Sequence, residues 1–257
     1  MKKKNSTIGL PTIILLVLGT FLFLNLIVRS TNVERDNRLA NNEFECNDSI
    51  CVEDIQISTN FDFVYDRFIV FNPDLDSSTV HTFNAVCEHY KLDTTEELLN
   101  WCVGQILLES GAKQYYETGH PKEGQLVQSS AGATGISQIM PATAYGNLKK
   151  YVTEEDVKEM AELGCTPFDF VNDTTCSYSE GLELSKTWLE NETNNIILWG
   201  FIMRKKLNKR PDILKVLVSY NAGTGGMINY VNSGGILAEH SYVKGIQTKL
   251  NYVEKNI

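Results

Sequence analysis

Apolar residues follow two different patterns along the 257-residue chain. In the first, residues 8–28 carry no charge at all. At about 1.5 Å of rise per residue, a helix of this length crosses the core of a bilayer. Lysines precede the run, and no small-residue cleavage site follows it. We therefore predict an N-terminal transmembrane signal-anchor over residues 1–29, rather than a cleaved signal peptide or a buried core helix.

The basic residues beside this segment predict its orientation. Lys2, Lys3 and Lys4 lie before it, whereas the arginines after it are mixed with acidic residues. Lysine and arginine next to a membrane span tend to stay in the cytoplasm. We therefore expect a single-pass membrane protein with a cytoplasmic N-terminus, whose remaining residues are extracytoplasmic, either periplasmic or at the cell surface.

The second pattern begins after a polar stretch. Residues 30–60 are rich in asparagine and acidic residues, which is typical of a stalk. Residues 61–71 are apolar and aromatic and are expected to pack on the domain as a short strand or helix. A break at Pro73 separates them from the longer C-terminal part of the chain. We assign residues 30–76 to a stalk and packing segment, and residues 77–257 to the main domain.

Within residues 77–257 the apolar positions recur mostly at helical spacing, and alternating strand-like runs are scarce. One helix is predicted over residues 80–92, and a second from a start at Asp93 and Glu96 to its end at Glu109. Further helices are predicted over residues 153–163, 179–190, 194–207 and 211–220, the last with Pro211 in its first turn. The predicted fold class is mainly α.

The charge balance limits the partners of the outer part. Once the four basic residues of residues 1–29 are set aside, 19 basic residues face 32 acidic ones, a net charge of −13. Nucleic-acid binding depends on clustered lysine and arginine, so we expect no nucleic-acid partner. A polymer bound by this surface would be held by short-range contacts in a groove.

All six cysteines lie beyond the predicted anchor. An even number in an oxidising compartment favours disulfides, and we expect nearest-neighbour pairs 46–51, 87–102 and 165–176. Zinc is the competing interpretation, but there is no Cys-x-x-Cys motif and the four histidines are scattered. We predict no metal site.

The candidate chemistry begins with Glu109. Leu98, Cys102, Ile106 and Glu109 are spaced 4, 4 and 3 residues apart, so they share one helix face. A carboxyl group at the end of this apolar stripe would lose hydration, its pKa would rise, and it could hold a proton near neutral pH. The alternative is that Glu109 ends the helix in solvent, and this helix taken alone favours that alternative.

Two further segments carry small and polar residues. Residues 129–144 contain glycines that allow close backbone approach, and Gln138 offers an amide suited to a sugar hydroxyl. A phosphate loop and a dinucleotide site are excluded, because their glycine motifs are not present in the required context. At the end of the last predicted helix, Tyr220 is expected to be half-buried with its hydroxyl free, and Gly223 to stop the helix.

Together these segments resemble one family. Glu109-Ser110, then Gly135-Ile136-Ser137-Gln138-Ile139-Met140-Pro141-Ala142-Thr143-Ala144, then Ser219-Tyr220-Asn221-Ala222-Gly223 are similar to the ordered motifs of the soluble lytic transglycosylase catalytic domain. The resemblance covers about residues 80–250 and implies a lysozyme-like helical domain after the transmembrane helix. It also implies that Glu109 is the catalytic residue, and it assigns contacts with the sugar or with Glu109 to Ser110, Ser137, Gln138, Tyr220, Asn221 and Tyr242.

The chain departs from the family's pattern at several places. Ser137 stands where the family usually has methionine, and residues 111–130 form a longer connection that we interpret as a flap. The segment around Cys165 and Cys176 resembles an insertion. Tyr242-Val243 is similar to the family's closing motif, but Ala238 occupies the position of its glutamate, so no role is carried over to Glu239.

The resemblance implies cleavage of the β-1,4 bond between N-acetylmuramic acid and N-acetylglucosamine in peptidoglycan, which gives 1,6-anhydro ends without a cofactor. One alternative is a hydrolase like goose-type lysozyme, with Glu123, Asp169 or Asp173 as a second carboxylate. Another is a wall-binding protein that keeps the fold without catalysis. Partners in the envelope or in a secretion machinery are left open.

Overall fold

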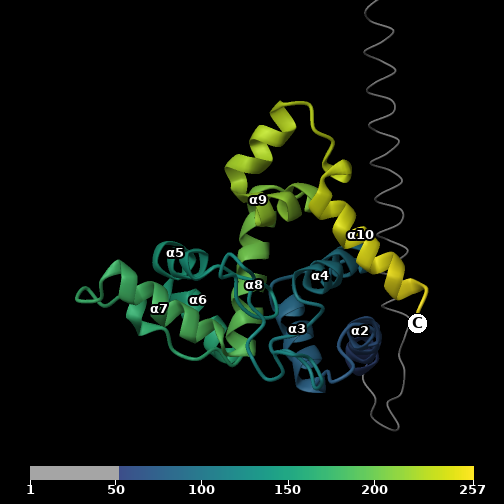
Figure 1. Cartoon of the computed structure of the whole chain (residues 1–257), viewed down its shortest axis with the longest axis horizontal. Helices are drawn as coiled ribbons and strands as arrows, with labels where there is room; N and C mark the ends of the chain where they lie inside the picture. The colour runs from purple at the N-terminus through teal and green to yellow at the C-terminus, as the bar shows by residue number, and fades with distance from the viewer. Residues whose placement is uncertain (1–51) are drawn as a thin grey trace, which may run out of the picture. The chain divides into compact units, whose positions relative to one another are not determined.

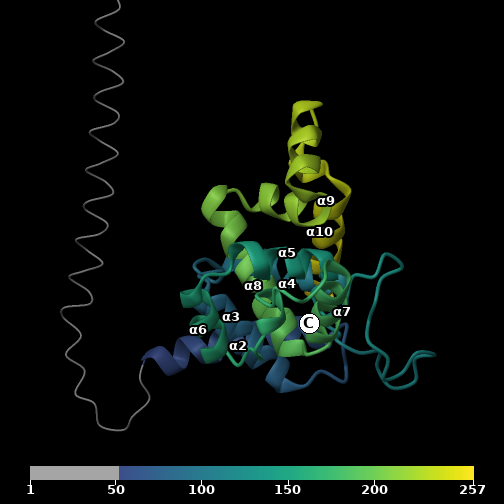
Figure 2. The same cartoon turned by 90° about the vertical axis from the view of Figure 1, so that its left-hand side faces the viewer.

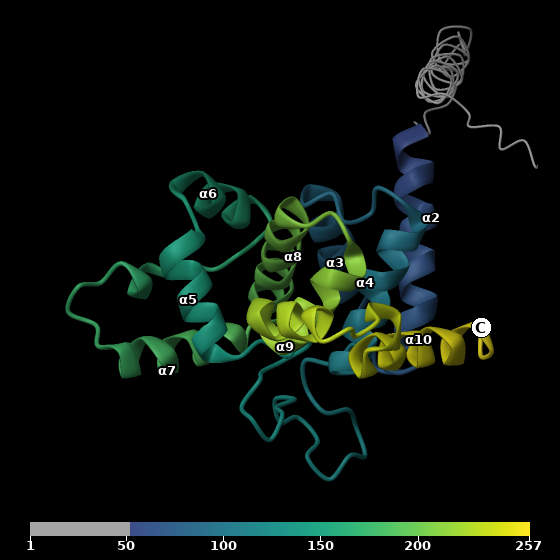
Figure 3. The same ribbon diagram turned by 90° about the horizontal axis from the view of Figure 1, so that it is seen from above.

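A long central helix organises the part of the chain that the structure describes. The computed structural model describes residues 52–257, with side chains from residue 60 onward. Helix α8 (Glu192–Lys209) lies between two groups of helices (Figures 1 and 3). It packs on α3 of the first group, which also contains α2 and α4, and on α7 of the second group, which also contains α5 and α6.

The described residues are mainly helical, as predicted. The helices are α2 (Val52–Ile69), α3 (Ser77–His89), α4 (Glu96–Glu109), α5 (Pro141–Tyr151), α6 (Glu154–Glu162), α7 (Tyr178–Leu189), α8, α9 (Ile213–Asn232) and α10 (Ser241–Glu254), with 3-10 helices η1 (Asp169–Val171) and η2 (Leu237–Glu239). Between residues 52 and 257 the only β pairing consists of isolated bridges.

All six helices predicted within residues 80–220 are present, with shifted ends. Two of the expected starts are wrong. Thr95 rather than Asp93 caps α4, because the Thr95 hydroxyl accepts a hydrogen bond of 3.1 Å from the Leu98 amide. Pro211 precedes the cap of α9, where the Asp212 carboxylate accepts from the Leu214 amide at 3.0 Å. Helices α5 and α10 were not predicted.

The compact unit begins earlier than the predicted boundary at residue 77. Residues 52–60, expected in the stalk, form the first half of α2. Residues 61–69 continue that helix, and Val64 and Phe68 are fully buried in the core. The helix therefore belongs to the domain, because its apolar face is covered by α3 and α4.

The predicted anchor and the Cys46–Cys51 pair lie outside the described residues. Among residues 52–257, no helix combines the length and apolarity needed to cross a membrane.

Helices α4 and α10 lie unusually close together. A Cβ atom on Gly104 would lie 2.7 Å from Ile246 and 2.8 Å from Leu250, so only glycine fits without displacing these side chains. On the opposite side, Trp199 of α8 is fully buried and stacks on Phe83 at 5.2 Å between ring centroids. The first contact fixes α4 against α10, and the second fixes α8 against α3. Helices α4, α8 and α10 all carry residues of the candidate active site.

The connection between α4 and α5, residues 110–140, extends away from the helices (Figure 2). Buried Gln114 holds it at its base. The Gln114 carbonyl oxygen accepts from the Ile136 amide at 2.8 Å, and its nitrogen donates to the carbonyls of Leu189 and Glu190 at 3.0 Å. The connection therefore has a fixed base beside α4 and a long outer part, in the region where a flap was expected.

The cysteines correct a sequence prediction. Cys87, Cys102, Cys165 and Cys176 all have free thiols, so the pairs 87–102 and 165–176 are not formed in this structure. Cys87 and Cys102 are buried in the core, where burial raises the pKa of both thiols. They therefore stay protonated and pack as small apolar side chains.

Candidate active site

Glu109 is the last residue of α4, and its carboxyl group is partly buried at one end of a cleft. Burial raises its pKa from the usual 4.5 to about 7, and a hydrogen bond donated by the Tyr242 hydroxyl opposes that rise. The alternative that Glu109 ends the helix in solvent is therefore wrong. At neutral pH this group populates both its protonated and its ionised form.

A line of buried side chains sets the direction of the hydrogen bond to Glu109. The indole nitrogen of Trp199, which can only donate, bonds to the amide oxygen of Gln105 at 3.2 Å. The Gln105 nitrogen must then face Tyr242, and it donates to the tyrosine oxygen at 3.3 Å. The single hydroxyl proton of Tyr242 is left for Glu109. The core thus presents Glu109 with a donor that stabilises the ionised carboxylate.

Tyr220 is a second tyrosine near Glu109. Its hydroxyl, expected to be free, donates to the Ser137 carbonyl at 2.8 Å. Burial and the negative charge of Glu109 raise the pKa of Tyr220, so the phenol remains neutral. Tyr220 is also one of the residues that line the cleft.

Ser137 lies beneath the cleft rather than in it. Its side chain is fully buried, and its amide donates to the Asn195 side-chain oxygen at 3.0 Å. The Asn195 nitrogen donates in turn to the carbonyls of Thr134 at 2.9 Å and Leu189 at 3.2 Å. Ser137 therefore positions the loop that supports Tyr220, and it is too deeply buried to contact a ligand in the cleft.

Ser110 also supports the loop structure instead of facing the cleft. Its hydroxyl donates to the Ile136 carbonyl at 2.6 Å and accepts from the Lys113 amide at 3.1 Å. These two bonds fasten the end of α4 to the loop before α5. Ser110 is not among the residues that line the cleft.

Gln138 does line the cleft, with a backbone φ of 49°. Its amide nitrogen donates to the carbonyls of Gly135 at 2.8 Å and Val127 at 3.2 Å. Since the nitrogen is used to hold the loop, the amide oxygen is the atom that Gln138 can offer to a ligand.

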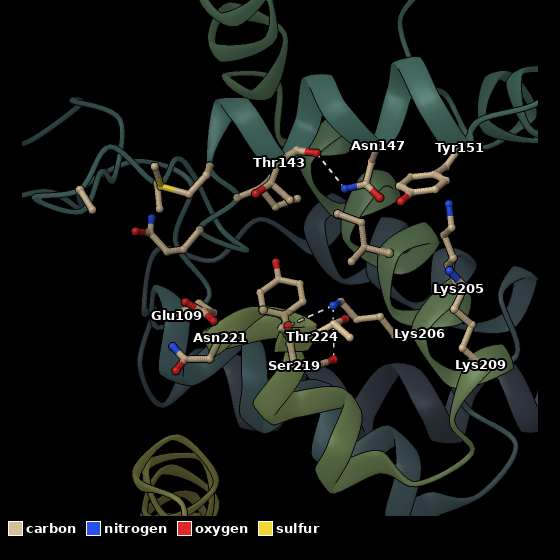
Figure 4. A pocket seen from close by; sticks show the side chains of 18 of the residues that line it. Glu109, Thr143, Asn147, Tyr151, Lys205, Lys206, Lys209, Ser219, Asn221 and Thr224 are labelled. Atoms are coloured by element: carbon tan, nitrogen blue, oxygen red, sulfur yellow. Dashed lines mark hydrogen bonds between the residues drawn. The ribbon is translucent and has the colours of Figure 1, made fainter. Parts of the chain in front are cut away.

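The cleft has a volume of about 550 Å³ and extends from Glu109 and Asn221 at one end to Lys205 and Lys209 at the other (Figure 4). Along one wall, Thr143, Asn147 and Tyr151 are spaced four residues apart on α5, so they line about 12 Å of that helix. A cleft of this length is suited to an extended polymer. The sequence interpretation missed this wall, although the four-residue spacing is visible in the sequence.

A break in α9 places Asn221 at the cleft. Gly223 has φ 72° and ψ 164°, a conformation that favours glycine, and it interrupts the helix where a stop was predicted. Asn221 and Thr224, on either side of the break, both line the cleft, and Asn221 lies beside Glu109 (Figure 4). The helix then resumes, so the glycine interrupts α9 instead of ending it.

The structure thus brings together Glu109, Gln138, Tyr220 and Asn221 at the cleft, with Tyr242 bonded to Glu109 from behind. Ser110 and Ser137 support this group from below. Of the described residues that line the cleft, Glu109 is the only carboxylic acid. Glu123, Asp169 and Asp173 do not line it.

Tyr242→Phe should raise the pKa of Glu109 further above its value of about 7, because the variant removes the donor that stabilises the carboxylate. The pKa can be measured by carbon-13 NMR titration of glutamate carboxyl groups. Tyr230→Phe is the matched control, since the Tyr230 hydroxyl bonds to the Ile236 carbonyl at 3.0 Å and does not line the cleft. An unchanged or lowered pKa in Tyr242→Phe would contradict the proposed direction of this hydrogen bond.

No protein-family model, no curated protein and no solved structure matches the chain.

Proposed function

We propose that this chain is a peptidoglycan lytic transglycosylase in which Glu109 acts first as the acid and then as the base. The observation that most directly supports this proposal is the partly buried Glu109 carboxyl group, with a pKa of about 7, at the end of an extended cleft. Catalytic acids and bases work best when their pKa lies near the working pH. The anchor over residues 1–29 and the extracytoplasmic location belong to the same proposal.

The lining of the cleft supports a carbohydrate substrate. Hydroxyl and amide side chains from α5 and α9 face the cleft, among them Thr143, Asn147 and Asn221, and they can bond to sugar hydroxyl and N-acetyl groups. Tyr151 offers an aromatic ring on the same wall, and such a ring can cover the apolar face of a sugar. This combination of neutral polar groups and an aromatic ring suits a glycan better than an apolar ligand.

In the proposed reaction, protonated Glu109 donates its proton to the glycosidic oxygen, and the bond from that oxygen to C1 of N-acetylmuramic acid breaks. The substrate's N-acetyl group stabilises the positive charge that develops at C1. Glu109, now ionised and bonded by Tyr242, then removes the proton from the muramic O6 hydroxyl, and O6 bonds to C1. The products are a 1,6-anhydro end and a free hydroxyl on the leaving sugar, and no water is consumed.

A single acid in the cleft favours this lyase over a hydrolase that uses two carboxylates. Two of the three acids suggested as a second carboxylate have local roles instead. Glu123 accepts from the Gly119 amide at 2.9 Å within the connection between α4 and α5, and Asp173 accepts from the Thr175 amide at 2.8 Å. A water-activating carboxylate would have to lie across the cleft from Glu109.

Product analysis tests the proposal. We expect mass spectrometry of peptidoglycan digested with the purified protein to reveal fragments that end in 1,6-anhydro-N-acetylmuramic acid. Fragments heavier by one water would indicate the hydrolase instead. Binding to walls without any released fragment would favour the wall-binding alternative.

A further inference from the structure

The end of the cleft opposite Glu109 is strongly basic, although the chain as a whole has a formal net charge of −9. Lys205, Lys206, Lys209 and Arg210 all line this end. They come from the last two turns of α8 and the residue after it, at spacings that turn them toward the same wall. Figure 4 shows the three lysine side chains entering from one side, with Tyr151 above them.

One of these cations has a structural partner. The Lys206 ammonium group donates to the Ser219 carbonyl at 3.0 Å and to the Ser219 hydroxyl at 3.3 Å. It thereby ties α8 to the segment of α9 that carries Tyr220 and Asn221. This contact accounts for Lys206 without a ligand.

The other three are not neutralised by the described part of the chain. Within residues 60–257, no carboxylate lies within ion-pair distance of Lys205, Lys209 or Arg210. The Lys205 ammonium instead lies 3.0 Å from the centre of the Tyr151 ring, and that of Lys209 lies 5.7 Å from it. Cations near the end of a helix interact favourably with its dipole, but this does not explain why three of them line a cleft that contains one acid at its far end.

Their electrostatic environment favours an anion. Burial and the positive charges of Lys209 and Lys150 lower the pKa of Lys205 to about 8, although the negative charge of Asp156 opposes them. Burial also lowers the pKa of Lys206, together with the charges of Arg210 and Lys209. An anionic group at this position would relieve the repulsion between these cations.

We propose that Lys205, Lys209 and Arg210 form a binding site for carboxylates carried by the glycan strand, and this inference rests on the proposed function. The sugar rings of the strand are neutral, whereas its muramic residues carry a lactyl group that is either a free carboxylate or is linked to a peptide stem with carboxylates of its own. A carboxylate held at this end would fix the register of the strand relative to Glu109. The cleft would then prefer substituted strands to neutral N-acetylglucosamine polymers.

Binding measurements in a Glu109→Gln background test the site, because that substitution prevents turnover during titration. The test variant adds Lys205→Gln, Lys209→Gln and Arg210→Gln. The control variant adds Lys158→Gln, Lys186→Gln and Lys255→Gln, which remove the same charge from residues that do not line the cleft. The three ligands are soluble glycan strands with peptide stems, the same strands after an amidase has removed the stems, and chitooligosaccharides of equal length.

We expect the test variant to bind stem-bearing strands about tenfold more weakly than the parent. A loss of this size corresponds to the combined contribution of a few solvent-accessible charge contacts. Its affinity for chitooligosaccharides should be unchanged, and the loss should shrink at high salt. A loss on stem-bearing strands alone identifies peptide carboxylates as the ligand, whereas a similar loss on stripped strands as well shows that the site also accepts the free lactyl carboxylate. A second variant, Lys205→Arg with Lys209→Arg, keeps the charge and should retain binding.

Two results would count against the proposals, and they differ. Equal affinity of the parent and the test variant for all three ligands would overturn the carboxylate site while leaving the proposed function intact. If the parent bound none of the three ligands, and the wild type released no fragments from walls, the proposed function would fall together with this inference.

Discussion

Replacing Glu109 with glutamine should reduce glycan cleavage by about a thousandfold or more. General acid and base catalysis each contribute roughly a hundredfold to ten-thousandfold, and in the proposed mechanism one carboxyl group performs both steps. Glutamine has nearly the same shape, but it neither donates nor accepts the proton that the reaction transfers. The rate of release of soluble fragments from purified peptidoglycan measures the effect. A Glu97→Gln variant, altered at an exposed position of the same helix, is the matched control and should cleave normally.

The same substitution should stabilise the fold at alkaline pH. The folded-state pKa of Glu109 is about 7 and the ordinary value is 4.5, so the folded protein binds the proton more tightly than the unfolded chain does. Stability is therefore lost as pH rises from about 4.5 to about 7, and the full penalty of about 3 kcal/mol is present above that range. At pH 8 Glu109→Gln should unfold at a higher denaturant concentration than the wild type, and near pH 4 the difference should vanish. If Glu109→Gln cleaved peptidoglycan at the wild-type rate, Glu109 would not be the catalytic acid and base.

Asn195→Ala should destabilise the protein by about 3 kcal/mol, because it leaves several buried polar groups without partners. The side chain of Asn195 is fully buried and bonds to the Ser137 amide and hydroxyl and to the carbonyls of Thr134 and Leu189. Equilibrium unfolding in urea measures the change. Since Ser137 in turn holds Tyr220, cleavage should also decrease.

Asn147→Ala is the control for this stability measurement. The Asn147 side chain lines the cleft and donates only to the Thr143 carbonyl of its own helix, at 2.8 Å, so its loss should cost less than about 1 kcal/mol. If Asn195→Ala cost no more than Asn147→Ala, the loop that carries Ser137 would not depend on Asn195, and the support proposed for Tyr220 would have to come from elsewhere.

The sequence predicted those helices whose apolar stripe is clear or whose ends carry strong signals. Thr153 and Ser177 cap α6 and α7 within a residue or two of the expected starts. Helix α5 was missed because its exposed face, with Thr143, Asn147 and Tyr151, forms the cleft and gives it a weak apolar pattern. The first half of α2 was read as a stalk because local polarity does not reveal that the later half of that helix is covered by α3 and α4.

Features of the candidate site could be predicted from the sequence only where they depend on the spacing of nearby residues. The apolar stripe before Glu109 offered a raised pKa as one of two interpretations, and that helix taken alone favoured the solvent-exposed alternative. The structure supports the raised pKa. The roles of Gln105 and Trp199 depend on contacts between residues far apart in the chain, which spacing cannot supply. The basic end of the cleft was missed for a related reason: lysines at the end of a helix are ordinary, and only the fold reveals that they face the cleft.

The hydrogen bond between Tyr242 and Glu109 joins residues separated by 133 positions in the chain. During translation Glu109 is synthesised long before Tyr242. Helix α10 must then dock against α4 before the two side chains can form their hydrogen bond. A partly synthesised chain, or one cut by a protease ahead of residue 241, therefore carries the acid without its tyrosine. In the proposed mechanism, wall cleavage should therefore begin only after residues 241–254 have been made and α10 has docked on α4.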